Sequence, residues 1–447
     1  MLEYINENVV SVLTPWLLLI AGIYFSVRLK FFYLRHPIKI VKSMFKKNKN
    51  SGTSPFRALT VALAGTLGVG NIVGVASSIA IGGYGSVFWM WVSALIAMVL
   101  KYAEIVLAIN HRRRDPATGE YHGGASYYIK DYFNSRGKRK IGLALALIFS
   151  FLCIANSVTM GCIIQSNAIS SSFSGVFGAR LLPIGLAIAI LSYIIISGNA
   201  DFIGAFCQRI VPAMTVGYIL LSVAALSIAG KERLLDAFSL IFNNAFELSS
   251  VGGGVIGFLF SRGLRAGTMR GLMSNEAGCG TAPTAHAAAD TDSAVKQGFL
   301  GLVEVFVDTV LLCTLTALVI IVAGERVLSF GNDPMMMAIE SFSTLLGAWS
   351  RYYMCLSVFL FAFATIICWA HYGKESVLYF SKKKVAIRAY TIGFSAFALF
   401  GALSAPQLAW TVADLALGVM TVINLIVLFL MSGEVAESTE KYFNDNS

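Results

Sequence analysis

Two glycine-rich stretches carry the residues best suited to bind a ligand. The first is GTLGVGNIVG, residues 65–74, and the second is SNEAGCGTAPT, residues 274–284. In each, two glycines lie one residue apart near an asparagine, inside a run that is otherwise apolar. Glycine lets the backbone leave helical geometry. An interrupted helix exposes N–H groups, which suit a carboxylate, and carbonyl oxygens, which suit a small cation. The two stretches therefore predict a binding site built largely from backbone.

Other interpretations of the first stretch are weaker. A dinucleotide fingerprint would need glycine at Val73 and a preceding strand. Gly70 and Gly74 form a GxxxG pair, which also lets two membrane helices pack closely. The second stretch, which contains Pro283 and follows a segment containing Arg270, shifts the balance. Two broken membrane helices roughly five spans apart are typical of an inverted-repeat secondary transporter.

The composition places these stretches in a membrane protein. The 447-residue chain is 57% hydrophobic and only 13% charged, with a net charge of +10, whereas soluble domains are about a quarter charged. Runs long enough to cross a bilayer, about 20 residues each, predict about 11 transmembrane helices. They lie near 9–27, 58–82, 84–108, 141–168, 181–198, 208–229, 247–283, 297–324, 345–370, 386–403 and 407–431.

Basic loops set the expected orientation. The segment 28–57, the segment from HRRR at 111–114 to RGKRK at 136–140, and SKKK at 381–384 follow the first, third and ninth runs. They should therefore share one side, which the positive-inside rule makes the cytoplasm. The N-terminus is then outside and the C-terminus inside. We expect the polar tail 432–447 to be disordered.

The breaks and the polar residues within the spans supply the candidate contacts. Those for a substrate carboxylate at the first break are Gly68, Gly70 and Asn71. Those for an ammonium group at the second break are Asn275, Gly278, Gly280 and Thr281. Glu276 is an acid inside the membrane, so it is either a coupling group or, as we favour, a brace for the broken helix. Gln165 suits a substrate contact and a helix-to-helix hydrogen bond equally. Glu304 and Asp308 could form a proton relay, although pairing with Lys or Arg is the favoured interpretation.

GGYGSVFWMWVSALIA at 82–97, together with GTLGVGNIVGVA and NEAGCGTAPTAHAAA, resembles the alanine/glycine:cation symporter family, the sodium:alanine symporters. The resemblance runs from about residue 10 to residue 431. It implies a leucine-transporter-like fold in which one extra helix and the basic loop, 1–57, precede two inverted five-helix repeats. These repeats would span 58–229 and 230–431, followed by the tail 432–447.

The resemblance also implies an ion site. The carbonyls of Ala64 and Leu67 are then Na⁺ ligands, and the Thr365 hydroxyl completes the shell because hard cations prefer oxygen. Trp369, one helical turn beyond Thr365, becomes a wall of the substrate pocket. Ala364 replaces a serine that is common in the family, which removes one possible ligand.

These inferences predict a multi-pass transporter in a prokaryotic cytoplasmic membrane that imports a small neutral amino acid, alanine or glycine, with Na⁺. We expect no enzyme activity, no cofactor other than the coupling ion, contact with membrane lipid, and no nucleic-acid partner. A proton-coupled carrier of another neutral amino acid and a nontransporting amino-acid sensor remain alternatives. An ion channel is disfavoured because no ring of charges or repeated filter stands out.

Overall fold

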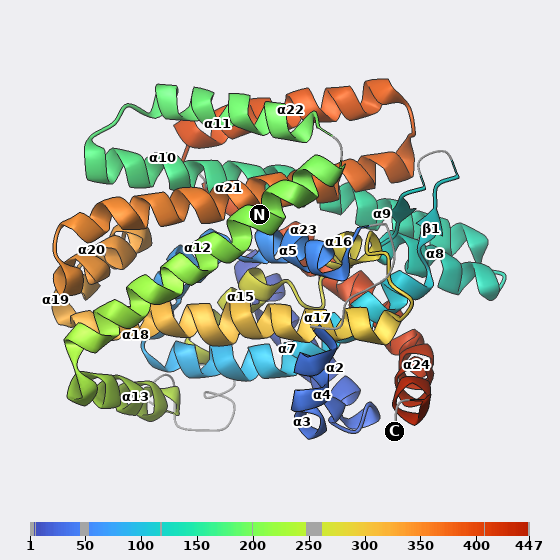
Figure 1. Cartoon of the computed structure of the whole chain (residues 1–447), viewed down its shortest axis with the longest axis horizontal. Coiled ribbons are helices and arrows are strands. Elements are labelled where there is room, and N and C mark those ends of the chain that lie inside the picture. The colour runs from blue at the N-terminus through green and yellow to red at the C-terminus, as the bar shows by residue number, and fades with distance from the viewer. Residues whose placement is uncertain are drawn as a thin grey trace.

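The computed structural model describes residues 4, 6–44, 53–116, 119–198, 200–246, 262–405 and 407–445, which are mostly helical (Figure 1). The first elements are η1 Asn6–Val10, α2 Ser11–Arg28, α3 Phe32–Arg35, α4 Pro37–Met44, α5 Pro55–Thr66, η2 Val69–Asn71, α6 Val73–Gly82, α7 Gly85–Asn110, strands β1 Arg113–Arg114 and β2 Tyr121–His122, and α8 Ala125–Ser135. The next are α9 Arg139–Val158, η3 Thr159–Ile163, α10 Ile164–Phe177, α11 Leu181–Ile196, α12 Ala200–Ala229, α13 Lys231–Ala245, α15 Arg262–Asn275 and α16 Pro283–Ala287. The last are α17 Ala294–Val305, η4 Phe306–Cys313, α18 Thr314–Ala323, α19 Glu325–Leu328, α20 Pro334–Leu346, α21 Trp349–Phe380, α22 Lys384–Leu403, α23 Gln407–Leu430 and α24 Ser432–Asp445.

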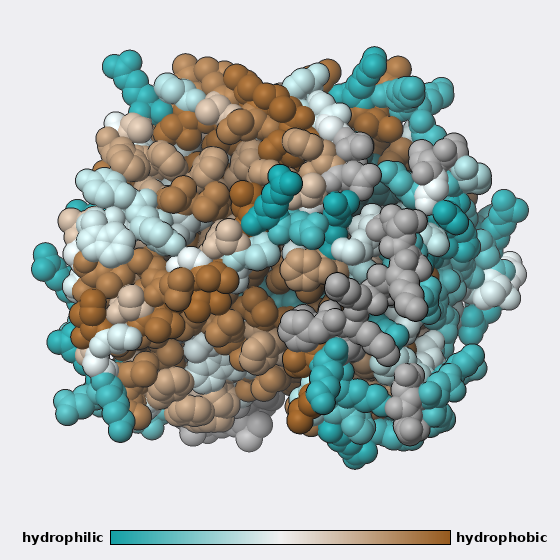
Figure 2. Space-filling model, in the orientation of Figure 1, coloured by the Kyte–Doolittle hydropathy of each residue, from teal (hydrophilic) through white to brown (hydrophobic). Residues whose placement is uncertain are grey.

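The helices confirm a multi-span membrane protein. Seven helical segments in the described part are long and apolar enough to cross a bilayer, and α2, α6 and α11 are shorter apolar helices. Each of the 11 predicted runs coincides with a helix, although 247–261 of the seventh run lies outside the described residues. Figure 2 shows a broad apolar surface, with hydrophilic side chains gathered mainly toward its margins. Exposed Ile194 on α11, Leu220 on α12 and Phe400 on α22 suit contact with lipid tails.

The core is organised around two long helices. Helix α7 packs against α15, α17 and α2, and α21 packs against α5, α9 and α10. Both broken segments therefore lie against these helices: α5 contacts α21, and α15 contacts α7. Gly68 and Gly278 are in close contact with side chains of neighbouring helices, which leaves no room for a Cβ at either position.

One end of the helices gathers the three basic loops and α24. Lys30 in the first loop is 3.0 Å from Glu440, and His111 in the second is 3.2 Å from Glu434. Lys382 in the third lies 3.7 Å from Asp115, next to the hairpin. Figure 1 places α8, β1 and α24 together at this end. The prediction that these loops share one side is confirmed for the described residues.

The prediction that the tail is disordered is wrong. Residues 432–445 form the amphipathic helix α24, whose Val435 and Thr439 are buried. The Thr439 hydroxyl lies 2.7 Å from the Tyr102 hydroxyl of α7. The tail is polar overall, but its few apolar residues fall on one face of a helix. This helix is stable because its apolar face packs against the rest of the protein.

We expect the docking of α24 to weaken at alkaline pH. Burial opposes a charge on His111, but hydrogen bonds to Asp131 and Glu434 outweigh it and raise the pKa of His111 to about 9. A histidine with a raised pKa contributes its full stabilisation below its ordinary value of about 6.5 and loses it as the pH rises through about 9. A spin label at the exposed position Glu437 should therefore gain mobility between pH 8 and pH 10. In the His111→Gln variant the label should already be mobile at pH 7, and a pH-independent spectrum in both proteins would contradict the prediction.

Candidate functional site

The first glycine-rich stretch interrupts a helix, as predicted. Helix α5 ends at Thr66, the short turn η2 follows, and α6 begins at Val73. The Gly68 amide donates to Asn71 Oδ1 at 3.1 Å, and the Val69 amide donates to Gln165 Oε1 at 3.2 Å. A side chain at Gly68 would place its Cβ 2.6 Å from Thr365 Oγ1, so only glycine allows this approach. The break therefore presents amide donors that hydrogen-bond to polar side chains.

The second stretch also breaks its helix. Helix α15 ends at Asn275 and α16 begins at Pro283. Gly278 and Gly280 have φ values of +85° and +78°, and Glu276 has φ +52°. The left-handed region is open to glycine and costs other residues energy. A glutamate held there indicates that its surroundings fix it in place, which is a common property of functional sites.

Three predicted cation ligands converge. The Thr365 hydroxyl lies 3.0 Å from the Ala64 carbonyl and 3.5 Å from the Leu67 carbonyl. These contacts join α21 to the end of α5. The same hydroxyl lies 3.0 Å from the Phe361 carbonyl of its own helix. Carbonyls at the broken end of α5 lack the usual helical partners. The arrangement gives a cluster of oxygens of the kind that binds a small hard cation.

Two adjoining cavities lie beside this cluster. The outer one, called here the vestibule, has a volume of about 690 Å³. The inner one, called the narrow cavity, has about 20 Å³, which is the space for roughly one water molecule. Its lining comprises Gly65, Thr66, Gly68, Val69, Gly70, Gly74, Met160, Ile164, Gln165, Arg270, Met273, Thr365 and Trp410.

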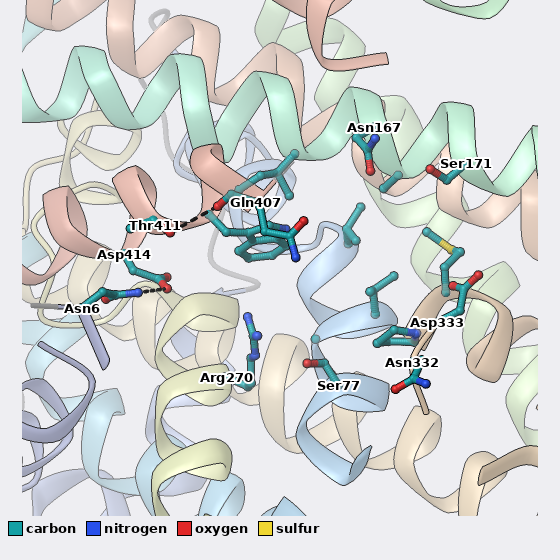
Figure 3. A pocket seen from close by; sticks show the side chains of 18 residues that line it. Asn6, Ser77, Asn167, Ser171, Arg270, Asn332, Asp333, Gln407, Thr411 and Asp414 are labelled. Carbon is teal, nitrogen blue, oxygen red and sulfur yellow. Dashed lines mark hydrogen bonds between the residues drawn. The ribbon is translucent and has the colours of Figure 1, made fainter. Parts of the chain in front are cut away.

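Arg270 and Trp410 are among the residues that line both cavities. The Arg270 guanidinium lies over the Trp410 ring, 5.2 Å from its centroid, which is a cation–π geometry. Figure 3 shows the Arg270 side chain pointing into the vestibule, where Asn6 donates to Asp414 at 3.0 Å on one wall. Val69 and Gly74 of the first break also line both cavities, so the vestibule reaches this break beside the Arg270–Trp410 pair.

The predicted site residues divide into two groups. Gly68, Gly70, Gln165 and Thr365 line the narrow cavity. The remaining side chains and second-break backbone groups contact other parts of the core. Asn71 Nδ2 lies 2.6 Å from Asp308 Oδ1, Asn275 donates to Thr309, Gly278 accepts from Asn424, Gly280 donates to Glu104, and Thr281 donates to Glu276.

Trp369 is completely buried and lies outside the lining of both cavities. Its indole nitrogen donates to Glu276 Oε1 at 3.1 Å, and the ring packs against Gly161. With Thr281 bonded to the other oxygen of Glu276 at 2.6 Å, this carboxylate joins the second break to α21. That placement favours the role of Glu276 as a brace.

Glu304 has the basic partner that was predicted, and Asp308 has none in the described residues. Glu304 lies 3.1 Å from Lys101 and 3.0 Å from His286, with all three side chains fully buried. Asp308 is instead held by neutral groups, so its predicted pairing is wrong. The widened helical turn η4 directs the Asp308 carboxylate away from Lys101. The carboxylate instead accepts hydrogen bonds from Asn71 of the first break and from Ser274, next to the second.

Sequence reasoning missed Met160, Met273 and Trp410 as lining residues. Nothing in their local sequence distinguishes them from core residues, because only the packing of η3, α15 and α23 brings them to the first break. Arg270 carried a usable signal, since it is an arginine in the last turns of a helix that breaks within an apolar region.

The structure resembles that of a mutant of the Eremococcus coleocola manganese transporter, with a TM-score of 0.52 at 12% identity over 86% of this chain and 78% of that one. At this identity the likeness shows a shared fold. The sodium/alanine symporter AgcS of Methanococcus maripaludis is 36% identical over 96% of this chain and 93% of its own length. The probable sodium/glutamine symporter GlnT of Bacillus subtilis is 34% identical over 98% and 89%.

The fold and these relatives define a membrane transporter and not an enzyme. The chain belongs to the sodium:alanine symporter family. The sequence model of this family matches residues 1–447. Membership in this family indicates sodium-coupled symport.

Proposed function

We propose that the protein imports a small neutral amino acid, alanine or glycine, together with Na⁺ by alternating access. The observation that carries this proposal is the convergence of the Thr365 hydroxyl with the Ala64 and Leu67 carbonyls at the edge of the narrow cavity. The cation then lies beside the break whose amides receive the substrate carboxylate, so each ligand favours binding of the other.

The glycine-rich lining of the inner cavity suits a small substrate, which needs the cavity to widen beyond its present volume of about 20 Å³. Four glycines of the first break, Gly65, Gly68, Gly70 and Gly74, line it, and Met160 and Met273 cover it. A substrate enters this space when Gln165 releases the Val69 amide, which a carboxylate can take over. A zwitterion bound there would extend its ammonium group toward carbonyls of the second break.

The transport cycle follows from the cavities and the fold. Two inverted five-helix repeats with one extra N-terminal helix would rock about the site, as in other carriers with broken helices. The vestibule opens to the outside in this proposal, because the basic loops at the opposite end face the cytoplasm. A cysteine at Asn167 in the vestibule should react with a membrane-impermeant thiol reagent added to intact cells.

The decisive experiment is radiolabelled alanine uptake into proteoliposomes with an inward Na⁺ gradient, with K⁺ replacing Na⁺ as control, and with a pH gradient alone. Uptake that requires Na⁺ supports the proposal. Uptake driven only by the pH gradient would assign coupling to a proton. No uptake of alanine or glycine under any gradient would overturn the proposal and favour another substrate or a sensor.

A further inference from the structure

The chain turns sharply where the helix α2 ends. Helix α2 ends at Arg28, and within the turn that follows Lys30 and Phe31 have φ values of +56° and +50°. This left-handed region costs residues other than glycine energy. The Phe31 amide donates to the Ser26 carbonyl at 2.8 Å, which helps to hold the turn. The chain therefore leaves the direction of α2 at a fixed point.

Beyond the turn, α3 and α4 hold one face against the protein. Phe32 and Ile40 are buried. The centroid of the Phe32 ring lies 4.6 Å from that of the Tyr102 ring on α7, and α4 packs against α17. Figure 1 shows α3 and α4 near α24 at the margin of the molecule, beyond α7 and α17. The buried face fixes which side chains of α4 point outward.

The outward face of α4 is apolar. Ile38 and Val41 are 69% and 50% exposed, and residues three apart share a face of a helix. Leu34 on α3 is exposed as well. Helix α4 is too short to cross a bilayer, and it begins at Pro37, soon after α2 ends among the basic loops. A short helix with an apolar face at this place suits the boundary between lipid headgroups and tails.

The same segment carries only positive charge. Residues 28–57 contain nine Lys or Arg and no Asp or Glu. Arg35 on α3 and Lys42 on α4 are exposed. Lys42 follows Ile38 by four residues and so lies on the same face of α4. A lysine there can lay its apolar stem along that face while its ammonium group reaches a headgroup. The chemistry that complements this surface is an apolar layer topped by negative charge.

We propose that α3 and α4 form a binding surface for anionic phospholipids of the cytoplasmic leaflet. Ile38 and Val41 enter the boundary between headgroups and acyl chains, and Arg35 and Lys42 contact the lipid phosphates. The turn after Arg28 sets α4 beside the bilayer surface instead of along the path of α2. None of these residues lines the vestibule or the narrow cavity, so this surface is separate from the proposed amino-acid site.

The depth of α4 is measured with a spin label on the full-length protein in bilayers of phosphatidylcholine and phosphatidylglycerol. All seven native cysteines are buried, so the label reacts with an introduced cysteine. At Ile38→Cys, collisions with oxygen should exceed those with a water-soluble nickel chelate. Glu437→Cys, at an exposed position on α24, is the matched control and should show the reverse. A label at position 38 that meets nickel as often as the label at position 437 would overturn the inference.

The preference for negative charge is measured with a fluorophore at Ile38→Cys and brominated lipids, which quench it on contact. Brominated phosphatidylglycerol should quench at least about twofold more than brominated phosphatidylcholine at the same mole fraction, and added salt should reduce the difference. Arg35→Gln with Lys42→Gln should remove the difference. Lys382→Gln with Lys383→Gln is the matched control, because it removes two exposed charges from the third basic loop and should preserve the difference.

Equal quenching by the two lipids in the protein with its native charges would overturn the inference. An unchanged preference in the Arg35→Gln, Lys42→Gln protein would overturn it too, because the charge would then act from elsewhere. Neither measurement involves transport, so a failure of alanine uptake would overturn the proposed function and leave this inference standing.

Discussion

Replacing Thr365 with alanine should weaken the Na⁺ dependence of uptake strongly while leaving the fold intact. The Thr365 hydroxyl is the side-chain oxygen that faces the Ala64 and Leu67 carbonyls. Losing one of so few ligands should raise the Na⁺ concentration for half-maximal uptake at least about tenfold, which is about 1.4 kcal/mol of binding free energy. Uptake into proteoliposomes against Na⁺ concentration measures the change.

Two further variants separate ion binding from helix structure. Thr365→Ser keeps the hydroxyl and should keep most of the Na⁺ affinity. Thr344→Ala removes another hydroxyl that bonds to the carbonyl four residues earlier, at 2.8 Å, and should leave Na⁺ dependence unchanged. Thr365 makes the same kind of bond to Phe361. If Thr365→Ala binds Na⁺ as the wild type does, the hydroxyl serves its own helix and the proposed ion site is wrong.

Replacing Lys101 with methionine should lower the free energy of unfolding more than any other substitution proposed for this protein. Lys101 and Glu304 are both fully buried and 3.1 Å apart. Without the lysine, His286 is the one described basic group within ion-pair distance of the buried Glu304 carboxylate. Removing one partner of a buried ion pair typically lowers the free energy of unfolding by about 3–5 kcal/mol. We expect a lower melting temperature and a lower yield of folded protein in detergent.

Lys30→Met provides the matched control, because Lys30 pairs with Glu440 at a similar distance but both side chains are mostly exposed. This change should barely alter the melting temperature, since water screens exposed pairs. The double variant Lys101→Met with Glu304→Gln should recover part of the loss. Equal melting temperatures for Lys101→Met and Lys30→Met would show that the buried pair contributes little.

The sequence was sufficient to predict the helical segments and the two breaks, because both depend on local patterns. Apolar runs marked the helices, and glycine spacing marked Gly68 and Gly278 as points where the backbone leaves helical geometry. Thr365 and the α5 carbonyls were predicted together only through the family resemblance. Their separation of about 300 residues leaves no local signal.

The packing of the polar interior was less predictable. The sequence contains Glu304 and Asp308 one helical turn apart, which suggests similar partners. The η4 turn rotates them apart, so one reaches Lys101 and the other reaches Asn71. The position of Trp410 beside Arg270 likewise depends on how α23 meets α15, and the folding of α24 depends on a surface that α7 provides.

The contacts between the two ends of the chain bear on how the protein is made. Asn6 bonds to Asp414, the Tyr24 hydroxyl lies 3.0 Å from the Ser432 hydroxyl, and Lys30 pairs with Glu440. The ribosome completes the first member of each pair long before the last. The N-terminal segment therefore lacks these partners until translation is nearly complete, and a chain stalled before α23 would make none of the three contacts. Such chains should be preferred targets of membrane quality-control proteases.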